Sequence, residues 1–137
     1  MRSALASCLA LVLVTACSGD DEEGQPLQPA NTLVLDGRVA SDHGSATVTA
    51  SGEPVTVGAG DFFFEPTVLT GPAGEAVTLE VLSDSQNLHN VTAGEVDQDL
   101  ATGEAVEVEL SFPDTGTLVF VCKYHQDRGM AGALVAT

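Results

Sequence analysis

Apolar and polar residues alternate in several short runs from residue 32 onward, and this alternation constrains the fold more than any other feature. Successive side chains of a β-strand point to opposite faces, so the pattern predicts strands with one buried and one solvated face. The clearest runs are residues 55–59, 77–82 and 106–111. Clusters of turn-forming residues separate the runs, at residues 71–74, 93–94 and 113–116. Strands and turns therefore account for most of the chain.

The number of strand signals indicates two packed sheets. Short apolar runs predict further strands at residues 62–64, 68–69, 118–121 and 133–135. About seven to eight short strands with regular turns are typical of a β-sandwich, so we expect an all-β, Greek-key β-sandwich. Residues 33–50 predict an extra strand or hairpin ahead of the main sandwich, and residues 96–100 predict at most one helical turn.

Residues 1–16 have the features of a signal peptide. A positive charge at Arg2 precedes an apolar stretch, which is too short for a membrane-spanning helix of about 20 residues. The stretch ends in Leu-Val-Thr-Ala-Cys, which resembles the bacterial lipobox, although Val14 stands where that motif usually has Leu. The resemblance implies cleavage before Cys17 and attachment of a diacylglyceryl group to this cysteine. A secretory signal cut elsewhere, with Cys17 as an incidental thiol, is the alternative.

The rest of the chain has the composition of an acidic tether followed by one folded domain. Residues 17–31 contain four consecutive acidic side chains and two prolines, which predict a flexible tether. Residues 32–137 form the expected domain, with a core at about 55–137. The hydrophobic content of 44% is sufficient for such a core, and we expect a monomer. The net charge of −16 argues against binding to nucleic acid, which requires a basic face.

Cys122 is the one cysteine that the folded domain would keep. Cys8 would leave with the signal peptide, and Cys17 would carry the lipid. Cys122 would then have no disulfide partner, and an unpaired cysteine in an exported protein requires an explanation. Metal ligation is one such explanation.

Cys122, His125 and Met130 follow one another closely at the end of an apolar strand. A strand end that leads into a loop can fold such side chains around one ion, and Gly129 would let the loop return toward it. Two histidines, one cysteine and a weak axial methionine form the type 1, or blue, copper site. His89, in a turn-like stretch, would be the second histidine. We therefore predict one type 1 copper ion bound by His89, Cys122, His125 and Met130.

These residues give the chain a resemblance to the cupredoxin family. The Cys-x2-His-x4-Met segment and the upstream His89-Asn90 pair match the plastocyanin-like pattern of that family. The likeness covers about residues 55–136, and all four of the family's ligand types are present. It implies a β-sandwich of the cupredoxin type, and it implies that Asn90 ties the two ligand loops together by hydrogen bonds. One departure is Lys123-Tyr124, which is bulkier and more charged than the matching part of many such loops.

The predicted site favours a one-electron carrier. Four protein ligands leave no open position for water or substrate, whereas catalytic metal sites typically keep one, so we expect no enzymatic activity. The family likeness implies that electrons pass through the edge of His125, and the partners would be redox proteins. We expect the protein to be exported and held on the extracytoplasmic face of the cell membrane by a lipid on Cys17.

Other functions would use the same ligands. The protein could scavenge or deliver copper, or it could be an accessory cupredoxin module in metal uptake. A cupredoxin fold that never holds copper is a further alternative, and the complete ligand set argues against it.

Overall fold

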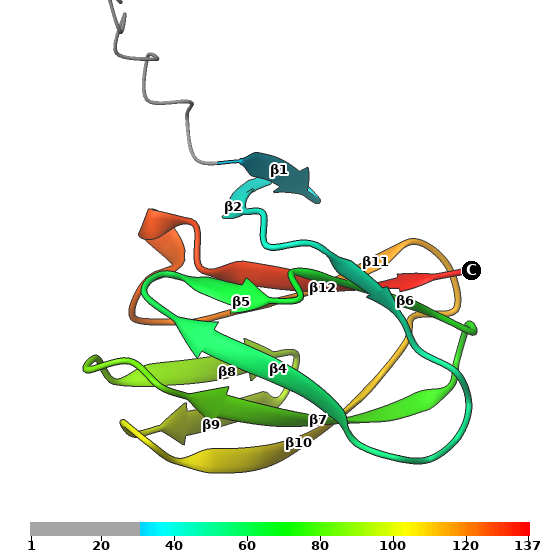
Figure 1. Ribbon diagram of the computed structural model, residues 1–137. Helices are drawn as coiled ribbons and strands as arrows, with labels where there is room; N and C mark the ends of the chain where they lie inside the picture. Colours follow the sequence, from blue (N-terminus) through cyan, green and yellow to red (C-terminus); the bar gives the residue numbers. More distant parts are fainter. Residues whose placement is uncertain (1–30) are drawn as a thin grey trace, which may run out of the picture.

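The computed structural model describes residues 31–137, which are almost entirely β-structure (Figure 1). The strands are β1 (Thr32–Leu35), β2 (Arg38–Ser41), β3 (Ser45–Thr47), β4 (Val55–Gly60), β5 (Phe63–Glu65), β6 (Val68–Gly71), β7 (Ala76–Ser83), β8 (His89–Ala93), β9 (Val96–Leu100), β10 (Ala105–Ser111), β11 (Thr117–Val121) and β12 (Ala131–Ala136). A short 3-10 helix, η1 (Gln126–Arg128), lies between β11 and β12. The predicted signal peptide and the predicted lipidation of Cys17 concern residues outside this described part. Within it, no helix is both long and apolar enough to cross a membrane.

Two sheets form a sandwich. One sheet has four strands in the order β10-β7-β4-β5, and the other has six in the order β3-β6-β12-β11-β8-β9. Most neighbouring strands are antiparallel, but β4 runs parallel to β7, and β6 runs parallel to both β3 and β12. The predicted all-β sandwich is confirmed. The described residues form twelve strands, more than the seven or eight expected. Three of them, β1, β2 and β3, lie where one extra strand or hairpin was predicted, and β8 and β9 were not predicted as strands.

Apolar side chains from the inner faces of both sheets fill the space between them. Val57 of β4 and Val81 of β7 face this core from one sheet, and Val91 of β8 faces it from the other. Phe64 of β5 meets Phe120 of β11 edge-on, with 5.1 Å between the ring centroids. Every second residue of β7 is buried, as its alternation predicts.

The segment before β4 contains both a hairpin and a further strand. Strands β1 and β2 pair as a separate hairpin, whose Leu35 and Ala40 pack with Ala131 and Ala133 of β12. Figure 1 shows this hairpin, in blue, outside the sandwich on the side of β12. Strand β3 then pairs with β6 and forms the edge of the six-stranded sheet. The hairpin therefore covers part of the outer face of the sheet that leads into the ligand loop.

Residues 96–100 form strand β9, so the predicted helical turn is wrong. β9 is an edge strand that pairs with β8 along its whole length. Its three central residues, 97–99, are all exposed, so no apolar alternation marks the strand in the sequence. Hydrogen bonds to β8, which is separated from it only by a tight turn, provide the β-structure that the local pattern does not reveal.

Candidate metal centre

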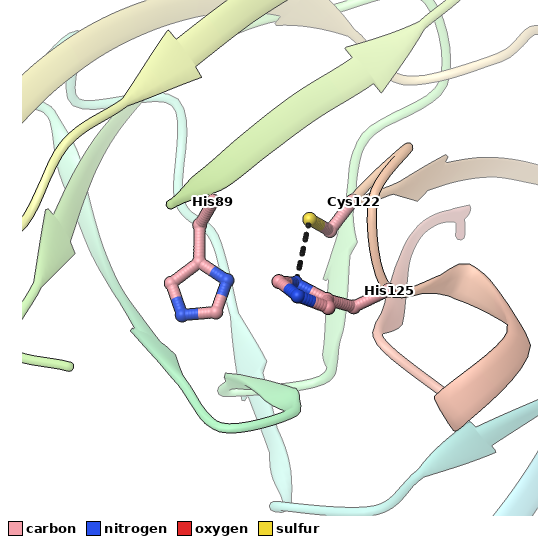
Figure 2. Close-up of side chains that lie close together, drawn as sticks. All are labelled: His89, Cys122 and His125. Atoms are coloured by element: carbon pink, nitrogen blue, oxygen red, sulfur yellow. Dashed lines mark hydrogen bonds between the residues drawn. The ribbon is translucent and has the colours of Figure 1, made fainter. Parts of the chain in front are cut away.

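Three side chains with metal-binding atoms meet at one end of the sandwich. His89 begins β8, Cys122 directly follows β11, and His125 lies in the loop before η1. β8 and β11 are antiparallel neighbours, so the beginning of β8 lies beside the end of β11. The possible ligand atoms of all three residues lie within 4.8 Å of one another. Figure 2 shows the three side chains converging, with the sulfur of Cys122 next to the ring of His125.

Backbone hydrogen bonds close the loop that carries Cys122 and His125. The His125 N–H donates to the Cys122 carbonyl, and the Cys122 N–H donates to the Met130 carbonyl, both at 3.0 Å. The Met130 N–H donates to the His125 carbonyl at 3.3 Å. Gly129 has a φ of 85°, which glycine adopts without strain and which lets the chain turn back. Met130 is fully buried and is held beside both loop residues; its role as the axial ligand stays a prediction.

His89 is a fully buried histidine with one nitrogen held and the other free. Its Nε2 lies 2.6 Å from Ser85 Oγ and 3.1 Å from Asp61 Oδ1. Its Nδ1 is buried and has no hydrogen-bond partner among the described residues. Desolvation by burial, and then the neighbouring His125, lower the pKa of His89 and favour the neutral ring. A neutral imidazole with an unpaired, buried nitrogen has the state that a metal ligand needs.

The environment of Cys122 favours a thiol unless a cation is present. The side chain is fully buried, and its Sγ lies 3.5 Å from Nδ1 of His125. Burial raises the pKa of Cys122, while hydrogen bonds from nearby backbone groups partly oppose this effect. A bound metal ion reverses the balance, because a coordinating thiol is deprotonated by the charge of the ion.

Asn90 connects the strand of His89 to the loop of Cys122. Its Oδ1 accepts hydrogen bonds from the backbone N–H of Lys123 at 3.4 Å and from the hydroxyl of Thr92. Its Nδ2 donates to the carboxylates of Asp97 and Asp99, at 2.7 and 2.8 Å. The bond to Lys123 spans the two ligand-bearing segments, which is the contact that the family likeness implies for Asn90.

Lys123 and Tyr124 are tied to the same two carboxylates. The Lys123 ammonium lies 2.7 Å from Asp97 Oδ1 and 3.0 Å from Asp99 Oδ1, and the Tyr124 hydroxyl donates to Asp99. The charge of Lys123 is therefore balanced locally by β9. Lys123 and Tyr124, the bulky part of the ligand loop, are thus held in place by the acidic side chains of the edge strand β9.

His125 is the half-buried member of the group, whereas His89 and Cys122 are buried. Its ring lies 4.5 Å from that of Phe62, and Phe62 in turn lies 4.6 Å beneath the guanidinium of Arg128. The site is therefore closed on the inside and approaches solvent through His125.

Sequence reasoning did not single out Asp61 and Ser85, the partners of His89 Nε2. Asp61 precedes His89 by 28 residues and Ser85 precedes it by four. No spacing motif joins these residue types, and acidic side chains are abundant, so only the folded chain reveals the contact.

The residues present fit a copper ion. A cysteine sulfur, two imidazoles and a buried thioether are the donor types of a type 1 copper site. The unpaired Nδ1 of His89 supports this fit independently of the sequence motif, because a buried polar atom without a partner is costly.

Comparisons with known proteins identify the family of the chain. The family model described as a cupredoxin-like domain matches residues 31–136. The halocyanin of Natronomonas pharaonis is 31% identical over 126 residues, which is 85% of this chain and 74% of the halocyanin.

Solved structures that share the fold include a blue copper protein and a multicopper oxidase. Auracyanin A, a "blue" copper protein from Chloroflexus aurantiacus, matches with a TM-score of 0.53 and 20% identity, over 67% of this chain and 100% of its own. A multicopper oxidase matches with a TM-score of 0.52 and 15% identity, over 78% of this chain and 46% of its own. At these identities the matches show the fold alone.

Proposed function

The chain belongs to the cupredoxin-like family, and on this basis we propose that it is a type 1 copper protein that carries one electron at a time. The observation that carries the proposal is the cluster of His89, Cys122 and His125, whose possible ligand atoms lie within 4.8 Å of one another. In addition, the buried Nδ1 of His89 has no hydrogen-bond partner among the described residues, so it is free to bind a metal ion.

In this proposal His89, Cys122, His125 and Met130 hold one copper ion. When bound, the ion supplies a one-electron couple between Cu(I) and Cu(II), for which sulfur and imidazole donors are together suited. The described residues hold the donors in place through the backbone bonds of the ligand loop and through Asn90. A site fixed in this way needs little rearrangement when its charge changes.

His125 is the proposed exit for the electron. It is the half-buried member of the cluster, and its neighbour in the chain, Tyr124, is 45% exposed. A redox protein that docks on this end would approach His125 more closely than His89, which is fully buried.

We propose a carrier and not an enzyme, because all four proposed donors come from the protein. Catalytic metal sites typically keep a position open for water or substrate. Within the described part of the chain, the one group of three or more His, Cys, Asp or Glu side chains that could hold a metal ion is His89, Cys122 and His125.

Voltammetry of the copper-loaded protein, together with a measurement of copper loss, tests the proposal. A carrier predicts a reversible one-electron couple and slow transfer of copper to an added chelator. Rapid loss of copper and no reversible couple would instead support a protein that scavenges or delivers the metal.

We further propose that the protein is exported and anchored to the membrane through a lipid on Cys17. The support is the lipobox-like sequence before Cys17. Cys17→Ser should move the protein from the membrane fraction to the soluble fraction of expressing cells. An unchanged distribution would contradict the anchor without affecting the copper proposal.

A further inference from the structure

Asp61 is a charged side chain that contacts the proposed ligand His89 from the side away from the cluster. It lies in the turn between β4 and β5, and its Oδ1 is 3.1 Å from His89 Nε2. The Asp61 side chain is 38% exposed, whereas His89 is fully buried. A carboxylate thus reaches from the surface to the outer nitrogen of a buried imidazole. Figure 2 shows the other nitrogen of His89, next to the ring carbon that bears Cβ, facing Cys122 and His125.

The contact with Asp61 favours one of the two positions for the proton of a neutral His89 ring. An ionised carboxylate only accepts hydrogen bonds, so its contact with Nε2 requires a proton on that nitrogen. An aspartate side chain is ordinarily ionised near neutral pH. Nδ1 then carries the lone pair, and Nδ1 is the atom without a partner among the described residues.

Ser85 is compatible with the same arrangement. Its Oγ lies 2.6 Å from His89 Nε2 and 3.3 Å from the Asn87 carbonyl oxygen. The hydroxyl can therefore donate to Asn87 and accept from the His89 N–H. Both contacts of Nε2 thus agree with a protonated Nε2 and a free Nδ1.

We propose that Asp61 is a positioning residue that strengthens His89 as a ligand and lowers the reduction potential of the copper site. A carboxylate that accepts from the outer N–H of a metal-bound histidine fixes the ring and makes its other nitrogen more basic. The negative charge also favours the more positive Cu(II) state over Cu(I). This inference rests on the proposed function, and it adds a determinant of the potential outside the four ligands.

The exposure of Asp61 limits the size of the effect. Solvent screens the charge of a side chain that is 38% exposed, so we expect the lower end of the range known for such supporting residues. Removal of such a supporting residue typically weakens metal binding by about 10–100-fold. We expect Asp61→Asn to weaken Cu(II) binding by about tenfold relative to Cu(I) binding, because the lost charge favours Cu(II). For a one-electron couple this fold-change corresponds to a rise of about 59 mV in the potential.

Asp61→Asn is the test variant, because it removes the charge and keeps an oxygen that can accept the hydrogen bond. Asp114→Asn is the matched control, since it removes one negative charge from an exposed residue in the turn before β11. Asp114 precedes β11 and Cys122 follows it, so the control residue lies at the opposite end of this strand from the proposed site. We expect the potential of the copper-loaded full chain to rise in the Asp61 variant and to stay near the parent value in the Asp114 variant.

Nuclear magnetic resonance of the Cu(I) form gives a second readout. A charged acceptor makes a stronger hydrogen bond than a neutral one, so the Nε2 proton of His89 should resonate at lower field in the parent than in Asp61→Asn. A structural role alone would not produce both this shift and the higher potential. If Asp61→Asn does not fold, Asp61→Glu and Asp61→Gln repeat the comparison, and the Glu variant should have the lower potential.

The outcomes separate the two claims. A parent protein without a copper-dependent reversible couple would contradict the proposed function itself. A parent with that couple, and equal potentials in the Asp61 and Asp114 variants, would overturn only the role of Asp61. A Nε2 proton absent from His89 in the Cu(I) parent would also overturn it.

Discussion

Gly132 lies where β12 passes over the ring of Phe120, and we predict that Gly132→Ala destabilises the fold. The two residues are cross-strand partners in β11 and β12. A Cβ atom at position 132 would lie 2.3 Å from Phe120 Cζ and 2.9 Å from the Thr67 carbonyl oxygen. Phe120 is 1% exposed and packs against Phe64, so its ring has little space into which to move. Overpacking of this kind costs about 1–3 kcal/mol of unfolding free energy.

Urea unfolding of the metal-free protein measures this cost. The midpoint of Gly132→Ala should fall while the slope of the transition stays unchanged. Gly58→Ala is the matched control, because Gly58 also lies in a strand but its added Cβ would meet its nearest atom, the Glu65 carbonyl oxygen, at an ordinary 3.7 Å. Alanine in a strand interior is favoured over glycine by about 0.5–1 kcal/mol, so this variant should be as stable as the parent or more stable.

A double-mutant cycle identifies the clash. Phe120→Leu removes the ring atoms nearest the added methyl group, so Gly132→Ala should cost less in that background than in the parent. Equal stability of Gly132→Ala and Gly58→Ala would refute the steric reasoning. An equal cost of Gly132→Ala with and without Phe120 would refute the assignment to that ring.

Two further predictions concern charge and metal. Hydrogen bonds from Lys123, and then from Asn90, lower the pKa of Asp97 and Asp99 below the ordinary value of 3.8. The ionised carboxylates therefore stabilise the folded protein above pH 3.8. This stabilisation is lost as the pH falls through the lower pKa values that the two groups have in the folded state. In urea unfolding of the metal-free protein, Lys123→Met should therefore lose less stability than the parent as the pH falls below 3.8, and equal acid sensitivity would contradict this. Copper should raise the melting temperature, with a gain of about 2.7 kcal/mol at a free concentration 100 times the dissociation constant. Calorimetry should show that a chelator abolishes the gain, and a similar gain in Cys122→Ser would argue against ligation by the cysteine.

Sequence reasoning located strands that alternate in polarity, such as β7, and strands that form a short apolar run, such as β12, whose first four residues are all buried. β7 has buried residues at every second position, and its alternation is visible in the sequence. β9 has exposed residues at 97–99 because it lies at a sheet edge, and it becomes a strand through its pairing with β8. Alternation of apolar and polar residues arises where one face of a strand packs on a core. It therefore does not reveal a strand that is held mainly by backbone hydrogen bonds to its neighbour.

The same distinction applies to the site. Cys122, His125 and Met130 share one short loop, so their spacing alone suggests a common ion. Asp61 touches His89 only because the β4–β5 turn and the beginning of β8 meet in space. The sequence does not distinguish Asp61 from the other acidic residues, of which the chain has 20 in all. Only the geometry of the folded chain reveals its contact with His89.

Titration of Cu(II) into the protein, followed by visible absorption, tests the central claim most directly. If His89, Cys122, His125 and Met130 form a type 1 site, an intense charge-transfer band should appear and saturate at one equivalent of copper. Cys122→Ser should bind copper, if at all, without that band. Absence of the band from the parent protein, or its persistence in Cys122→Ser, would contradict the account.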